Sequence, residues 1–291
     1  MFVFKVAVVG AGTMGGEIAQ TIAAAEIPVV LKDVDAKFVE HGLEKARQVT
    51  EGQLSSLVKK EKLTQEQADA RLEETVGRIT GTTDYEGFGD VDFVIEAVPE
   101  RMVIKQAVLS ELDAATPGHA VLASNTSALS ISEMADATGR ADKVVGFHFF
   151  YPASIMRLIE VIEGDETSPE TVQAAMSFAQ AIRKMPIRCG EVPGFVVNRI
   201  LNAAVSEVWR IQEEEGLDPQ EIDKGVAESK AAPMGPFFLA DLLGLDTVLH
   251  VAEHLQESYG DRFYAHRGMQ ELVAAGHLGQ KTGKGFYEHG S

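Results

Sequence analysis

A glycine-rich segment near the N-terminus constrains the fold more than any other feature of the sequence. Gly10, Gly12 and Gly15 form the pattern G-x-G-x-x-G, which on its own occurs by chance. Here a β-branched, apolar run at residues 2–9 precedes the pattern, and a helix-favouring stretch at residues 13–25 follows it. This order predicts the strand–turn–helix unit that opens a parallel sheet covered by helices.

An aspartate stands where such a unit needs one to hold a dinucleotide. A second apolar run at residues 28–31 ends just before Asp33, 18 residues beyond Gly15. A carboxylate there accepts hydrogen bonds from the adenosine ribose and repels a 2′-phosphate, so the segment favours NAD over NADP. The alternative is a structural glycine turn beside a solvated aspartate. The predicted cofactor-binding residues of this segment are Gly10, Gly12, Thr13, Met14, Gly15 and Asp33.

The remaining sequence divides into an α/β part and a helical part. Residues 36–77 are charged and helix-favouring, which predicts a helical hairpin inserted there that turns near residues 62–64. Strand-like runs return, with helical stretches between several of them, at residues 92–97, 120–123, 143–150, 157–162 and 186–189. We therefore predict a doubly wound, Rossmann-type NAD domain at residues 1–189 and a smaller all-helical domain at residues 190–291.

Composition argues against several classes of partner. The 291 residues carry a formal net charge of −18, which disfavours nucleic acid and anionic membrane surfaces. No apolar run approaches the ~20 residues that a membrane helix needs. A single cysteine, Cys189, rules out an internal disulfide and fits a reducing compartment. We expect a cytoplasmic protein, or a matrix protein without its presequence, with no nucleic-acid partner, no membrane association and no metal site.

One histidine and one glutamate suggest the chemistry. His148 and Glu160 lie symmetrically about residue 154, so a hairpin that turns there would place them opposite each other across two antiparallel strands. A carboxylate on one imidazole nitrogen fixes the tautomer, and the other nitrogen can then take a proton from an alcohol. Oxidation of an alcohol by NAD needs such a base. Without Glu160, His148 would be interpreted as a core histidine among phenylalanines.

With these features in place, the sequence resembles the L-3-hydroxyacyl-CoA dehydrogenase family along essentially its whole length. The matching motifs are residues 10–15, 92–105, 124–127, 148–150, 158–161, 193–199, 235–237, 241–246 and 281–287. The resemblance implies reversible, NAD-dependent oxidation of an L-3-hydroxyacyl-CoA in fatty acid metabolism, either in β-oxidation or in its short-chain reductive counterpart. His148 would be the base and Glu160 its orienting partner.

The resemblance also implies roles for residues that spacing alone does not single out. Ser127 and Asn198 would lie where the 3-oxygen and the thioester of the substrate bind. Glu100, Lys105 and Asn125 would lie along the nicotinamide half of NAD. Two alternatives stay open from the residues themselves: Ser127 could cap the helix that follows it, and Asn198 could be a buried structural amide.

Three more residues bear on the substrate. Lys59 and Lys60, near the tip of the predicted helical hairpin, would suit the phosphates of coenzyme A, although a charge run is more often a solvated surface. Tyr151 stands where many family members have asparagine. We expect its ring to point inward and narrow the acyl pocket; the alternative is that it swings out and lines the cleft between the domains.

The helical domain would make a homodimer and close the substrate cleft, because family members commonly do so. Residues 196–209 and 237–251 carry more apolar surface than a domain of this size needs for itself. Two other functions remain open: a dehydrogenase of a free hydroxy acid or sugar acid on the same fold, and a non-catalytic NAD-binding structural protein.

Overall fold

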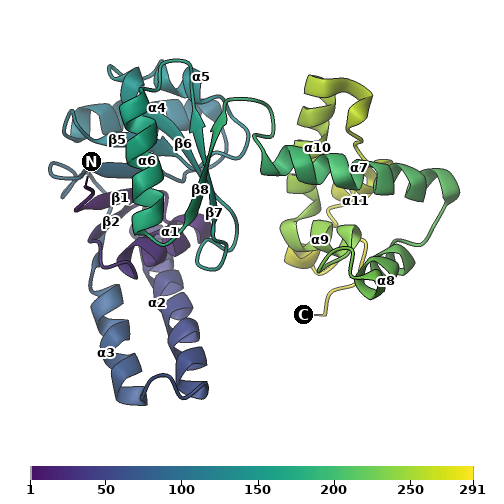
Figure 1. Ribbon diagram of the computed structural model, residues 1–291, viewed down its shortest axis with the longest axis horizontal. Helices are drawn as coiled ribbons and strands as arrows, with labels where there is room; N and C mark the ends of the chain where they lie inside the picture. Colours follow the sequence, from purple (N-terminus) through teal and green to yellow (C-terminus); the bar gives the residue numbers. More distant parts are fainter. Residues whose placement is uncertain (1, 291) are drawn as a thin grey trace. The chain divides into compact units, whose positions relative to one another are not determined.

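The computed structural model describes residues 2–290, which form two compact units that divide between Glu191 and Val192. The first unit is built on one eight-stranded sheet with the strand order β3-β2-β1-β4-β5-β6-β7-β8 (Figure 1). The strands are β1 (Val6–Val9), β2 (Val29–Lys32), β3 (Ile79–Thr82), β4 (Phe93–Glu96), β5 (Val121–Ser124), β6 (Val144–Phe149), β7 (Leu158–Glu163) and β8 (Met185–Gly190). Every neighbouring pair is parallel except β6 and β7.

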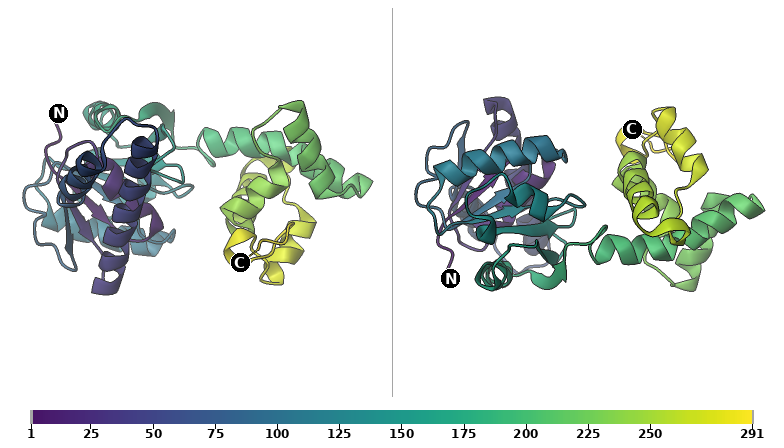
Figure 2. Two further views of the ribbon diagram at one scale, coloured as in Figure 1. Left: turned by 90° about the horizontal axis from the view of Figure 1, so that it is seen from below. Right: turned by 90° about the horizontal axis from the view of Figure 1, so that it is seen from above.

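Helices lie on both sides of this sheet (Figure 2). They are α1 (Thr13–Ala23), α2 (Ala36–Lys59), α3 (Gln65–Val76), α4 (Met102–Ala115), α5 (Ile131–Ala135) and α6 (Pro169–Ala181). Strands β1, β4 and β5 are buried along their whole length, as expected for strands covered on both faces. The strand order reverses between β1 and β4, and ligands of such sheets bind at the carboxyl ends of the strands at this point.

The core of the first unit is rich in phenylalanine. The rings of Phe93, Phe147 and Phe178 contact one another with centroids 4.6 to 5.7 Å apart, which joins β4, β6 and α6. Helices α2 and α3 extend away from the sheet as an antiparallel pair (Figure 1). Helix α3 begins with a capping box, in which the Thr64 hydroxyl accepts from the Gln67 amide and the Gln67 side chain accepts from the Thr64 amide.

The structure corrects two details of the sequence prediction. The first strand begins at Val6 rather than residue 2: Phe2 and Phe4 are exposed, and the Phe4 amide donates to the Asp92 side chain instead of to a strand. Strand β3 was not predicted. Only Ile79 of its four residues is buried, so this edge strand has no apolar run that would reveal it.

The second unit is helical. Its helices are α7 (Val197–Glu215), α8 (Pro219–Ser229), α9 (Pro236–Leu243), α10 (Leu245–Tyr259) and α11 (Arg267–Ala274). Trp209, Phe237 and Met269 are central to its core. The buried Asp241 carboxylate accepts hydrogen bonds from the amides of Phe286 and Tyr287, which fastens the C-terminal segment to α9.

The predicted fold class is confirmed: a doubly wound α/β sheet is followed by a helical domain. Among residues 2–290, no helix is both long enough and apolar enough to cross a membrane.

Candidate active site

The glycine loop between β1 and α1 has the shape that a dinucleotide needs. Gly10 has φ +99°, and a Cβ there would lie 2.5 Å from the carbonyl oxygen of Ala97. A Cβ on Gly15 would lie 1.7 Å from the carbonyl oxygen of Gly10, so only glycine lets the helix pack this closely. At Gly12, by contrast, no described atom outside the adjoining backbone lies within 4 Å of the missing Cβ, which leaves room for a ligand.

The start of α1 is prepared for an anion. Gly12 is the N-cap residue, so no side chain caps the helix, and the first turn carries no acidic residue. The first amide groups of a helix point outward and attract phosphate, because they lack partners within the helix. The loop and the helix start therefore fit the pyrophosphate of a dinucleotide.

Asp33 lies beside this loop, directly after β2. Its Oδ2 accepts a hydrogen bond from the Ala11 amide at 2.7 Å, and its Oδ1 accepts one from the Val34 amide at 2.7 Å. These two bonds fix the carboxylate next to the phosphate loop. A carboxylate held there fits the ribose hydroxyls of NAD and disfavours the 2′-phosphate of NADP.

His148 and Glu160 lie opposite each other on β6 and β7, as their spacing predicts. Nδ1 of His148 lies 2.8 Å from Oε2 of Glu160. The histidine is 6% exposed and the glutamate is completely buried. A carboxylate in this position accepts a hydrogen bond from the Nδ1–H group, which leaves Nε2 as the nitrogen that can accept a proton.

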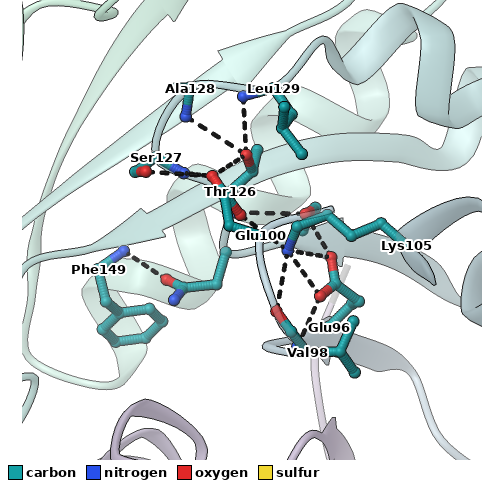
Figure 3. Close-up of polar contacts among 11 residues, drawn as sticks. Glu96, Val98, Glu100, Lys105, Thr126, Ser127, Ala128, Leu129 and Phe149 are labelled. Carbon is teal, nitrogen blue, oxygen red and sulfur yellow. Dashed lines mark hydrogen bonds and ion pairs between the residues drawn. The ribbon is translucent and has the colours of Figure 1, made fainter. Parts of the chain in front are cut away.

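Asn125 links the end of β5 to the strand that carries His148. Its Oδ1 accepts a hydrogen bond from the amide of Phe149 at 2.8 Å (Figure 3). Since β5 and β6 are parallel neighbours, this side chain fixes the carboxyl ends of both strands, where the predicted cofactor residues also lie.

Glu100 is the centre of a polar network beneath this edge of the sheet (Figure 3). Its Oε1 accepts from the Thr126 hydroxyl at 2.7 Å and from the Ser127 amide at 2.8 Å, while Oε2 pairs with Nζ of Lys105 at 3.2 Å. Burial raises the pKa of Glu100, but the Lys105 charge and these hydrogen bonds outweigh it, so the net pKa is lowered. Glu100 is thus held as a carboxylate.

Lys105 is buried within the network and is only 1% exposed. Its Nζ contacts Glu96 at 2.8 Å and the carbonyl oxygen of Val98 at 3.3 Å, besides Glu100. Lys105 therefore stabilises the Glu100 carboxylate from the buried side. Glu96, which also accepts from the Ser124 hydroxyl, was not predicted as a site residue. A carboxylate inside the apolar run at residues 92–97 was the signal that could have revealed it.

Ser127 does not cap the following helix. The hydroxyl of Ser130 does so, by accepting from the Glu133 amide at the start of α5. The Ser127 hydroxyl donates to Oε1 of Glu100 at 3.1 Å instead. The capping alternative for Ser127 is therefore wrong, because the cap lies three residues further along the chain.

The other predicted residues lie outside this network. Lys59 ends α2, and Lys60 follows it; both are exposed at the tip of the helical hairpin. Tyr151 is the second residue of the loop after β6 and is 49% exposed. Asn198 belongs to the second unit, in the first turn of α7, where it is half-buried and its carbonyl oxygen accepts from the side chain of Asn202 at 2.9 Å.

The fold, the glycine loop and the carboxylate at Asp33 define a dinucleotide-dependent oxidoreductase. Comparison with protein families narrows this class. Residues 5–192 match the NAD-binding domain of 3-hydroxyacyl-CoA dehydrogenase, and residues 194–289 match the C-terminal domain of the same family. The chain belongs to the 3-hydroxyacyl-CoA dehydrogenase family, and its cofactor is NAD.

Individual relatives agree with this assignment. The chain is 40% identical to a 3-hydroxybutyryl-CoA dehydrogenase of Clostridioides difficile, over 98% of this chain and 99% of the relative. The fold also matches a crystal structure of (S)-3-hydroxybutyryl-CoA dehydrogenase from Ralstonia eutropha. The match covers 100% of this chain and 100% of that one, with 39% sequence identity and a TM-score of 0.90. The fatty acid oxidation complex subunit alpha of Acinetobacter baylyi is 40% identical over 98% of this chain, but the chain spans only 39% of that protein.

The position of Asp33 predicts a clear preference for NADH over NADPH in binding. Asp33→Ser combined with Val34→Arg should weaken or reverse it, because the change removes a repelling carboxylate and adds a cation for the 2′-phosphate. Fluorescence titration with both reduced cofactors measures the ratio of their dissociation constants. Val34→Arg alone is the matched control, since Val34 is exposed and the carboxylate remains. Equal affinity of the unmutated protein for both cofactors would contradict the assignment.

Proposed function

We propose that this protein oxidises the 3-hydroxyl of an L-3-hydroxyacyl-CoA to the 3-ketone with NAD, and catalyses the reverse reduction. The observation that carries the proposal is the buried pair of His148 and Glu160 at the carboxyl-end region of an NAD-binding sheet. The relatives named as 3-hydroxybutyryl-CoA dehydrogenases make a four-carbon acyl group the first substrate to test.

The pair supplies the acid–base part of the reaction. When bound, NAD supplies the acceptor for the hydride that leaves C3 of the substrate. Nε2 of His148 takes the proton of the 3-hydroxyl, and the C3–O bond becomes the carbonyl. Glu160 stabilises the imidazolium that forms, because its buried carboxylate already holds Nδ1. In the reverse direction the imidazolium returns the proton to the oxygen.

The remaining site residues would bind and orient. Ser127 and Asn198 would contact the 3-oxygen and the thioester. Asn125 and Glu100 would face the nicotinamide half of NAD, and Lys105 would support this half by holding Glu100 in place. The Glu100 network supports this part of the proposal, because it gives the end of β5 a fixed polar surface.

Coenzyme A would be held in part by Lys59 and Lys60. Both ammonium groups lie at an exposed helix end, where they can reach an anionic phosphate without breaking an internal contact. We also propose a cytoplasmic location, which the single cysteine supports.

His148→Gln should lower kcat for L-3-hydroxybutyryl-CoA by a factor on the order of 10²–10⁴ and leave NADH affinity nearly unchanged. The amide cannot take the proton, whereas the cofactor is held by the glycine loop and Asp33. Stopped-flow formation of NADH and NADH titration measure the two effects. His119→Gln is the control, because this histidine is exposed and lies on another part of the unit. A His148→Gln protein with near-normal kcat removes His148 from the mechanism.

Tyr151 would shape the acyl site, because it follows His148 by three residues, in the loop that comes directly after the same strand. Tyr151→Asn should raise kcat/KM for longer acyl chains relative to short ones. The change should be at most about 10–200-fold for each methylene group by which the substrates differ. The measurement is kcat/KM across C4 to C16 substrates, with NADH affinity as the internal control. An unchanged profile would show that Tyr151 does not limit the acyl chain.

The helical domain, proposed as residues 190–291, would also form a homodimer. Exposed apolar side chains lie on α7 at Ile200 and Ile211 and on α9 at Leu242 and Leu243. Surface of this kind commonly marks an association site. Light scattering at micromolar concentration and moderate salt should give twice the 31.4 kDa mass of one chain. A monomer mass under these conditions counts against the dimer.

A further inference from the structure

The loop that joins β6 to β7 follows the proposed base directly along the chain. Residues 150–157 form this loop, and Phe150 at its start packs against the His148 ring with centroids 4.5 Å apart. One side of the loop is exposed, with Ile155 and Met156 at 70% and 41%. The other side is buried, and Ala153 there is completely inaccessible. The buried side therefore determines where the loop lies.

A buried lysine holds this inner side. Lys184, between α6 and β8, is only 8% exposed, and its Nζ donates to the carbonyl oxygens of Ala153 at 2.5 Å and Met156 at 2.8 Å. Burial lowers the pKa of Lys184, and the charge of Glu17 partly opposes this effect. The ammonium group thus binds two backbone carbonyl oxygens of the same loop, which lies outside the strand ladders on either side of it.

A buried glutamate on helix α1 holds the same loop. Glu17 lies on α1, is 2% exposed, and its Oε2 accepts from the amide and the hydroxyl of Ser154, both at 3.3 Å. Its Oε1 pairs with Nζ of Lys45 at 3.2 Å. The Thr21 hydroxyl, one turn further along α1, donates to the carbonyl oxygen of Glu17 at 2.9 Å and also lies 3.4 Å from the carbonyl oxygen of Ala153. Helix α1 begins at the glycine loop, so these contacts tie the β6–β7 loop to the helix whose start fits a pyrophosphate.

We propose that Lys184 and Glu17 are positioning residues, which hold the β6–β7 loop so that His148 keeps the orientation its reaction needs. Neither residue contacts substrate or cofactor in this role; both act through the loop. The inference rests on the proposed dehydrogenase function. A shift of about 1 Å in a catalytic group can cost on the order of 100-fold in rate, which makes such an anchor important.

Lys184→Met tests the role of the lysine, because methionine is similar in length but has no hydrogen-bond donor. With L-3-hydroxybutyryl-CoA, kcat should fall about 10- to 100-fold, while KM for NAD should change by less than about 2-fold. Deuterium at C3 should give a larger isotope effect on kcat than in the unmutated enzyme, because hydride transfer becomes the slower step. Lys143→Met is the control, because it removes a lysine whose Nζ lies 3.6 Å from the Asp142 side chain and which makes no described contact with the β6–β7 loop.

Hydrogen exchange gives a readout that does not depend on turnover. The amides of Ile155 and Met156 donate to the carbonyl oxygen of Pro152. In Lys184→Met they should exchange at least about 10-fold faster, while exchange in α1 stays the same. Lys184→Arg, which keeps the cation and its donors, should restore slower exchange and part of kcat. Glu17→Gln, which keeps Lys184, should change both readouts in the same direction by a smaller factor.

A folded Lys184→Met enzyme with normal kcat, isotope effect and loop exchange overturns the inference, even if its melting temperature is lower. If Lys184→Met does not fold, Glu17→Gln decides on the same readouts. If the unmutated protein fails to oxidise the CoA thioester, the proposed function fails, and loop exchange alone still decides whether Lys184 and Glu17 hold the loop.

Discussion

The proposed active site depends on one hydrogen bond between two buried side chains, His148 and Glu160. A carboxylate that is completely buried is costly unless a hydrogen-bonding or charged partner stabilises it, so the pair can persist only if the strands that carry it keep their register. β6 and β7 form the antiparallel pair of this otherwise parallel sheet, and this pairing places residues 148 and 160 face to face. The proposed acid–base chemistry is thus a consequence of sheet topology.

The surrounding structure fixes the ends of these strands from several sides. Asn125 ties β5 to the residue after His148, and the Glu100 network stiffens the loop after β5. Lys184 and Glu17 hold the buried side of the β6–β7 loop. Because the contacts come from elements far apart in the sequence, the base is held by the whole first unit. Such preorganisation is what keeps a proton acceptor in place while charge moves in the reaction.

Much of this arrangement could be predicted from the sequence, because hydrophobic periodicity and local residue spacing indicate it. The glycine loop, Asp33 and the hairpin symmetry about residue 154 are local signals, and the structure has the loop, the carboxylate and the strand register that they indicate. Lys184 and Glu17 were not predicted, since their partners in the β6–β7 loop lie 28 to 137 residues away along the chain. A buried charged residue gives no local sign of its partner, and the edge strand β3 has no apolar run to indicate it.

The site is proposed to reduce and oxidise a CoA thioester and not a free acid. The most direct test is the rate of NADH oxidation by the unmutated protein with acetoacetyl-CoA and, at the same concentration, with acetoacetate. The account predicts rapid loss of NADH absorbance with the thioester and little or none with the free acid. Faster turnover of the free acid would contradict it, and so would a protein that binds NADH but reduces neither compound.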